Sequence, residues 1–378
     1  MAVIEISSDD SSDSPPPLNR KRRRRAALQN TPLYARRSHH VATLCGISSR
    51  EYRKLKRWGI PDSVLMSLCF LQFAFGWASM ELDNVEWFAG VGMVQQAFEE
   101  ASFQSFTYEI EHDPYNMNFI SVAGFIYALQ LLRASKWRSF HNWGILCSSW
   151  IWISKAVTHR THINPRGLDH RQFVSQGNQM SARMTLCCLV LLAKKCIILV
   201  EQPLSSLLAF CQPWKMLNRA VMDIHPDQPD NLAATGMVSL TTWMGAFGAP
   251  TCKATNLYCS CVDVLLPLHR TMTKAQKDAI SGEATTTERV VVVKGRMIKK
   301  VTGRKKALKQ TQTYTRTFGD SVMMSYRAWL EKQPPLLQAD GSSSDSDYPE
   351  HCAELEDACM TPVLETLAAR HPQAPRVW

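Results

Sequence analysis

Two residues in the middle of the chain have side chains and positions suited to covalent chemistry. Cys147 and Glu201 each follow a short apolar run that predicts a β-strand. A thiolate is a strong nucleophile once polar or positive neighbours lower its pKa, and a buried carboxyl group can keep or share a proton. Because ligands and catalytic groups collect at the carboxyl ends of strands in open α/β sheets, both positions favour a functional site.

A basic segment follows Cys147 and is long enough, at residues 155–171, to be a functional loop. Lys155, His159 or Arg160 would lower the pKa of the thiol if they lay beside it. The structural alternatives are a buried apolar role for Cys147 and a strand-end ion pair with Lys or Arg for Glu201. Nearby tryptophans could stack on bases, but packing is the favoured role for Trp143, Trp150 and Trp152.

Residues 84–114 predict a strand, a glycine turn, a helix and a second strand. Gly90 and Gly92 form the turn, where a missing Cβ lets the backbone approach a ligand closely. Glu109 and Glu111 follow after about 20 residues, the distance at which a nucleotide-binding βαβ unit places a carboxylate on the ribose. A plain α/β turn is the alternative.

The elements that must position these residues fit within a chain of 378 residues with 45% hydrophobic content, enough for one large α/β domain. The net charge of +10 and the basic clusters at residues 20–25 and 294–309 favour a polyanionic partner or nuclear import. Twelve cysteines without a Cys-x-x-Cys pair predict reduced thiols and no metal site. Residues 64–80 and 184–200 predict buried elements rather than membrane spans.

The composition divides the chain into four parts. Residues 1–40 predict a disordered tail, 41–83 a helical extension, 84–330 the main domain and 331–378 a second disordered tail. Near the start, Val3 to Ile6 followed by Ser and Asp resembles a SUMO-interacting motif, which would add a strand to the partner's sheet. Together with the arginine run at residues 20–25, this motif predicts a nuclear location.

The order of the motifs resembles the DNA (cytosine-5) methyltransferase family of the S-adenosylmethionine-dependent superfamily. The resemblance covers about residues 85–330 and rests on FAGVG, on Cys147, on Glu-Gln-Pro at Glu201 and on a Gly-x-Pro turn before Lys253. It implies an α/β fold with a Rossmann-like class I methyltransferase sheet and helices on both faces.

The resemblance also implies roles for individual residues. Residues of the glycine turn would line the S-adenosyl-L-methionine site, the acidic residues after it would contact the ribose, and the late Gly-Asp-Ser-Val motif would help to close the pocket. These cofactor-binding residues are Phe88, Ala89, Gly90, Val91, Gly92, Glu109, Glu111, Ser321 and Val322.

In the family's reaction, Cys147 would attack C6 of a cytosine flipped out of double-stranded DNA, and C5 would receive the methyl group. Glu201 would hold the base, and Lys253 would replace an arginine of the family, with a simple surface lysine as the alternative. The chain departs from the family pattern by Ile145 and Leu146 in place of two prolines and by Gln202 in place of asparagine. One alternative function is a catalytically degenerate domain that acts as a DNA-binding or SUMO-dependent module. Another is a mobile-element accessory protein that keeps the methyltransferase fold.

Overall fold

The computed structural model describes residues 49–75, 81–224, 236–280, 286–293, 296–303 and 313–334. The SUMO-interacting-like motif, the arginine run at 20–25 and nearly all of the predicted C-terminal tail lie outside these residues. The predicted helical extension contains two helices, α2 (Ser49–Arg57) and α3 (Asp62–Phe75). None of the helices in the described ranges is long and apolar enough to cross a membrane.

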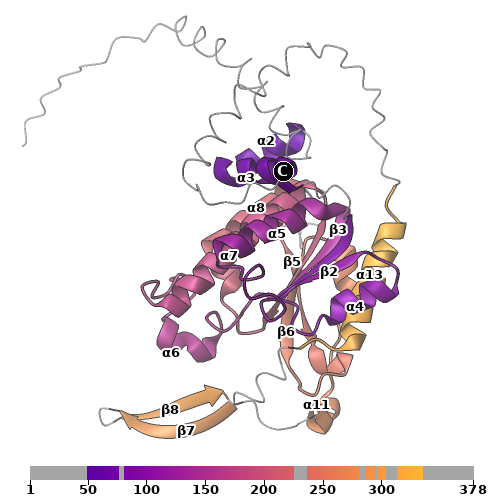
Figure 1. Ribbon diagram of the computed structural model, residues 1–378. Coiled ribbons are helices and arrows are strands. Elements are labelled where there is room, and N and C mark those ends of the chain that lie inside the picture. Colours follow the sequence, from indigo (N-terminus) through magenta and orange to yellow (C-terminus); the bar gives the residue numbers. More distant parts are fainter. Residues whose placement is uncertain are drawn as a thin grey trace, which may run out of the picture. The chain divides into compact units, whose positions relative to one another are not determined.

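A six-stranded sheet forms the centre of the α/β fold, with strands in the order β2-β1-β3-β4-β6-β5 (Figure 1). The first four strands in this order are parallel, and β6 runs antiparallel to both β4 and β5. The strands are β1 (Leu82–Trp87), β2 (Ser105–Tyr108), β3 (Ser135–Trp143), β4 (Ile197–Pro203), β5 (Val238–Trp243) and β6 (Ala254–Cys259). Since the strand order reverses between β1 and β3, ligands are expected at the carboxyl ends of these two strands.

Helices cover both faces of the sheet because alternate residues of the buried strands point to opposite sides. Ile198 and Val200 of β4 pack in a core with α5 (Val122–Ala134), α7 (Gln172–Ala193) and α8 (Gln212–Ile224). Their neighbours Ile197 and Leu199 pack with α4 (Met93–Glu100), α10 (Val262–Leu265) and α13 (Arg316–Glu331). The α/β class predicted from the sequence is therefore confirmed.

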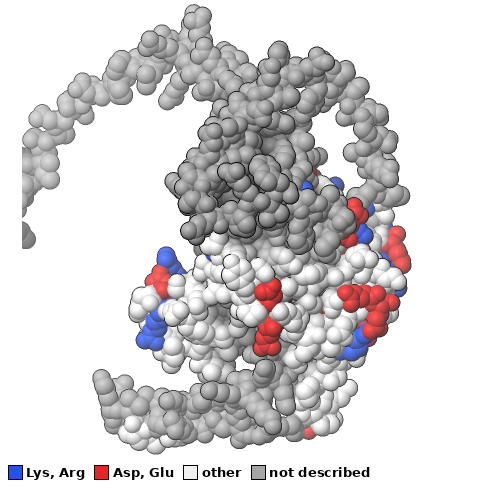
Figure 2. Space-filling view, viewed as in Figure 1, with Lys and Arg blue, Asp and Glu red and all other residues white. Residues whose placement is uncertain are grey.

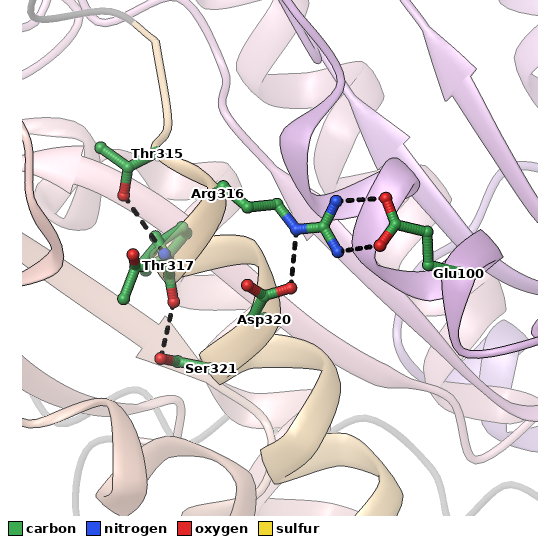
Figure 3. A network of polar contacts seen from close by, with 7 residues as sticks. Glu100, Thr315, Arg316, Thr317, Asp320 and Ser321 are labelled. Atoms are coloured by element: carbon green, nitrogen blue, oxygen red, sulfur yellow. Dashed lines mark hydrogen bonds and ion pairs between the residues drawn. The ribbon is translucent and has the colours of Figure 1, made fainter.

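Helix α13 lies directly against α4. A Cβ placed on Gly319 would lie 2.4 Å from the carbonyl oxygen of Met93, so glycine permits this close approach. The Arg316 guanidinium binds both carboxylate oxygens of Glu100 on α4, and its Nε donates to Asp320 at 2.8 Å (Figure 3). The end of the described chain thus covers the first helix that follows β1.

The predicted strand, glycine turn, helix and strand of residues 84–114 are confirmed as β1, α4 and β2. The strand expected just before Cys147 was misplaced, because β3 ends at Trp143 and Cys147 lies four residues later. Polar residues inside β3 interrupt the apolar pattern from which a buried strand is predicted. His141, which is fully buried, accepts a hydrogen bond from Trp87 Nε1 at 3.1 Å and contacts Ser139 Oγ at 3.0 Å.

One further predicted element boundary was also wrong, because Glu201 lies within β4 rather than after its end. Helix α5 begins at Val122, where Ser121 Oγ accepts a hydrogen bond from the Gly124 amide and caps the helix. Strand β7 (Thr286–Val293) pairs antiparallel with β8 (Arg296–Gly303), so this hairpin begins before the basic cluster at 294–309 and overlaps it only in part.

Short helices complete the connections between these elements. They are α6 (Lys155–Thr158), α11 (Lys274–Ile280), η1 (Trp152–Ser154), η2 (Leu208–Phe210), η3 (Met244–Phe247) and η4 (Leu266–Leu268).

Candidate functional site

The glycine turn follows the carboxyl end of β1 and leaves space beside its backbone. Phe88, Gly90 and Gly92 have positive φ angles of 58°, 58° and 70°. A Cβ on Gly90 would meet no described atom within 4 Å, whereas one on Gly92 would lie 3.2 Å from Thr107 Cγ2. Gly90 therefore leaves room for a ligand, and Gly92 is needed where the turn packs against β2.

Glu109 joins the glycine turn as the sequence predicted. Its Oε2 accepts a hydrogen bond from the Gly90 amide at 2.9 Å, and its Oε1 accepts one from the Glu111 amide at 3.3 Å. The side chain of Glu111 is exposed beyond this pair. One carboxylate therefore lies on the turn, and the cofactor roles of Glu109 and Glu111 stay predictions.

Glu86 on β1 is a second carboxyl at the turn, and sequence reasoning missed it. Its side chain is fully buried, and its Oε2 accepts a hydrogen bond from the Gln95 amide at 2.8 Å. Its Oε1 has no hydrogen-bond partner among the described residues. Burial raises the pKa of Glu86 to about 8, despite the opposing hydrogen bond from Gln95. An acidic residue inside an apolar strand was the available sequence signal.

Glu201 lies in a buried cluster with one ammonium group and one hydroxyl group as hydrogen-bond donors. Lys253 Nζ lies 3.0 Å from its Oε1, and the Tyr314 hydroxyl donates to its Oε2 at 3.4 Å. Burial, the largest single effect, would lower the pKa of Lys253, but the charge of Glu201, its hydrogen bond and the charge of Cys147 together raise it. Burial, followed by the Glu201 charge, raises the pKa of Tyr314 well above its usual value. Sequence reasoning gave no role to Tyr314.

Cys147 is half-buried beside this cluster, and its thiol is not activated. Burial raises the pKa of Cys147 to about 11, the charge of Glu201 raises it further, and Lys253 opposes both effects. The expectation that the basic segment lowers this pKa was therefore wrong. The geometry does bring Cys147, Glu201 and Lys253 into one electrostatic group, as the sequence order implied.

Arg160 has a structural contact set instead of a contact with the thiol. It is buried, with its guanidinium 3.5 Å from the centre of the Trp150 ring. Its Nε donates to the Ser149 carbonyl at 2.9 Å and its Nη1 to Asn178 Oδ1 at 2.8 Å. Burial lowers its pKa to about 10. Arg160 thus fixes the segment after Cys147 on α7.

The backbone before Cys147 is held by side-chain hydrogen bonds rather than by prolines. Gln202 Nε2 donates to the Ile145 carbonyl at 2.9 Å, and its Oε1 accepts from Ser206 Oγ at 2.8 Å. The Gly144 amide donates to the Trp87 carbonyl at 3.0 Å. A Cβ on Gly144 would lie 2.9 Å from the Tyr314 hydroxyl. This segment therefore connects the glycine turn with the Glu201 cluster.

The two late cofactor-binding candidates lie on α13. Val322 is fully buried in the core that contains α4. Ser321 Oγ donates to the Thr317 carbonyl at 2.7 Å (Figure 3). It also accepts a hydrogen bond from Arg270 Nη2 at 2.9 Å. Both residues support the helix that covers α4, and direct contact with a cofactor stays a prediction.

The described residues contain no group of three or more His, Cys, Asp or Glu side chains that could hold a metal ion. The chain matches no family model, no curated protein and no solved structure in the comparisons. Its function must therefore be argued from the geometry of the site.

Proposed function

We propose that the protein is an S-adenosylmethionine-dependent methyltransferase of the DNA (cytosine-5) type with a Rossmann-like class I sheet. The observation that carries this proposal is the junction at Gly144. Its neighbouring atoms include the backbone of the glycine turn and the hydroxyl of Tyr314, which binds Glu201. The glycine turn after β1 and the Cys-Glu-Lys group thus approach each other beside the point where the strand order reverses, which supports a ligand site there.

The residues of the turn fit a nucleotide-like cofactor. Gly90 has free space beside it, and Glu86 offers a buried carboxyl oxygen without a partner among the described residues. Phe88 to Gly92, with Glu109, would hold S-adenosylmethionine, which supplies the methyl group when bound. A neutral Glu86 at neutral pH, consistent with its raised pKa, is able to donate or accept a hydrogen bond there.

The Cys147 group would act on the base. The thiolate of Cys147 would add to C6 of cytosine, C5 would receive the methyl group, and loss of the C5 proton would then expel the thiolate and restore the base. Glu201 would hold the base edge near N3 and the exocyclic amine. Lys253 would keep Glu201 oriented and is the cation whose charge lowers the pKa of the Cys147 thiol. Binding of a base edge by Glu201 would spread its charge and thereby favour the thiolate, since that charge raises the pKa of Cys147.

The second candidate is a catalytically degenerate methyltransferase fold that acts as a nuclear DNA-binding or SUMO-dependent module. The raised pKa of Cys147 favours this candidate, because a protonated thiol is a poor nucleophile. The two candidates share the cofactor site and the nuclear location but differ in the reactivity of the Cys147 thiol.

Methyl transfer from labelled cofactor to cytosine-containing DNA tests the enzyme directly. Transfer should occur with the natural chain and disappear in Cys147→Ser. Calorimetry with S-adenosylmethionine gives the second readout, with Gly90→Val expected to block binding by filling the space beside the turn. Cofactor binding without transfer would select the degenerate candidate, and absence of cofactor binding would refute the methyltransferase proposal.

A further inference from the structure

Six large apolar side chains are exposed on the two segments that follow β3 and β4, and we call them the rim. Five of them are about half exposed, and one is almost completely exposed. The rim residues are Leu146 at 52%, Trp152 at 52%, Val157 at 50%, Ile163 at 97%, Leu204 at 53% and Phe210 at 41%. Exposed apolar side chains that gather in a patch mark a binding surface, whereas singly scattered ones need no explanation.

The two segments that carry the rim are joined to each other. A β-bridge pairs Ile151 with Ser206, and the Leu207 amide donates to the Trp150 carbonyl at 3.0 Å. The rings of His162 and Phe210 contact each other with centroids 4.4 Å apart. The rim is therefore one surface contributed by two loops.

This surface borders the candidate nucleophile and its neighbours. Leu146 precedes Cys147 in the chain, and the Leu204 amide donates to the carbonyl of Ala254, the residue after Lys253, at 3.3 Å. Trp152 differs from its neighbours Trp143 and Trp150, which are buried. Packing, the role favoured from the sequence, thus accounts for two of these tryptophans and leaves half of Trp152 exposed.

The charge around the rim suits phosphate groups. Between residues 144 and 183 the sequence has one acidic residue, Asp169, and its carboxylate pairs with Arg166 at 2.6 Å. The exposed basic residues of the same stretch are Lys155, Arg166 and Arg171. Arg160 is buried, and Arg183 donates to the carbonyls of Phe119 and Ser121. Basic side chains lie over α6 and the loop after it (Figure 2). A polyanion with apolar faces matches this combination of rim and charge.

A nucleic acid offers free base faces only where its bases are unpaired. In a duplex the base faces are stacked, and a protein meets phosphates and groove edges instead. Apolar side chains pressed against phosphates would remove water from charged groups without replacing its hydrogen bonds. Arg160 already fixes the loop that carries Trp152, so little conformational entropy is lost when a base stacks on this side chain.

We propose that the rim binds unpaired nucleotides by stacking, so that the protein's nucleic-acid substrate is single-stranded. This inference rests on the proposed function, because it delivers an already unstacked cytosine to Cys147. It names the substrate class of that function and removes the need to flip a base out of a duplex.

Fluorescence anisotropy with the full chain tests the proposal with three labelled probes of one sequence and length at one salt concentration. The probes are single-stranded DNA, single-stranded RNA and duplex DNA. At least one single strand should bind about tenfold more tightly than the duplex, and the preferred strand identifies the natural source. Equal or tighter binding of the duplex, or no binding of any probe, would overturn the proposal.

Variants of Trp152 localise the contact. Trp152→Ala should weaken single-strand binding by about tenfold, and Trp152→Phe should retain most of the affinity, since a stacked base contributes about 1–3 kcal/mol. Met324→Ala removes a side chain that is 63% exposed on α13 and is the matched control. If Trp152→Ala and Met324→Ala bind equally well, the rim is not the site. Calorimetry with S-adenosylmethionine stays a separate readout, so loss of the cofactor function would be seen independently of strand binding.

Discussion

The reactivity of Cys147 should respond in opposite directions to removal of its two charged neighbours. Glu201 raises the pKa of the thiol and Lys253 lowers it. Glu201→Gln should therefore lower the pKa of Cys147 and increase the thiolate fraction. Lys253→Met should raise the pKa and decrease that fraction. Both substitutions approximately preserve side-chain length.

The magnitude follows from the raised pKa. With a pKa of about 11, about one thiol in a thousand is ionised at pH 8. A unit charge several ångströms away contributes about 1–2 kcal/mol at an effective dielectric constant near 20, or about one pKa unit. The rate of alkylation should thus rise about tenfold in Glu201→Gln and fall about tenfold in Lys253→Met.

Alkylation by iodoacetamide, followed by mass spectrometry of the Cys147 peptide, measures both rates. Glu100→Gln removes an exposed acid on α4 and should leave the rate unchanged. A change of the same sign in Glu201→Gln and Lys253→Met would refute the electrostatic reasoning, because it would show that each substitution simply opens the site.

Three further substitutions test the structure around the site. Glu86 has a pKa raised from 4.5 to about 8, so the folded chain binds the extra proton and stability should fall as pH rises between these values. Glu86→Gln should abolish this component, of up to about 5 kcal/mol, in urea unfolding between about pH 5 and pH 9; an unchanged slope contradicts the assignment. Gly319→Ala should destabilise the fold by about 1–3 kcal/mol, measured by thermal unfolding, because its Cβ meets Met93; Ser325→Ala on the same helix is the control. Gln202→Leu should leave the buried Ile145 carbonyl without its donor and cost about 1–3 kcal/mol. Faster limited proteolysis near Cys147 should accompany it, and unaltered cleavage would argue against this contact as the support of the loop.

The sequence predicted the elements whose buried residues are apolar. Residues 84–114 contain regular apolar spacing, and their strand, turn, helix and strand all form. β3 was misplaced because its interior holds the buried polar residues Ser139, His141 and Asn142, and His141 is bonded by Trp87 of β1. The periodicity of apolar residues predicts which positions are buried only where the buried side chain is itself apolar.

The candidate site was predictable in order but not in chemistry. Cys147, Glu201 and Lys253 form one group, as their motifs implied. The donor that completes it, Tyr314, lies 113 residues from Glu201 in the sequence. The pKa of Cys147 likewise depends on burial and on residues distant in the chain, which explains why its basic neighbours in the sequence misled the prediction.

The contact of α13 with α4 has a consequence for synthesis of the chain. Val94 and Phe98 of α4 share their core with Phe318, Val322 and Tyr326 of α13, more than 200 residues later. During translation the apolar side of α4 leaves the ribosome long before its covering helix exists. Because closure of this core depends on such a distant segment, the domain should complete folding only after residue 331 has emerged. Nascent chains stalled earlier should therefore be protease-sensitive and should bind chaperones through α4.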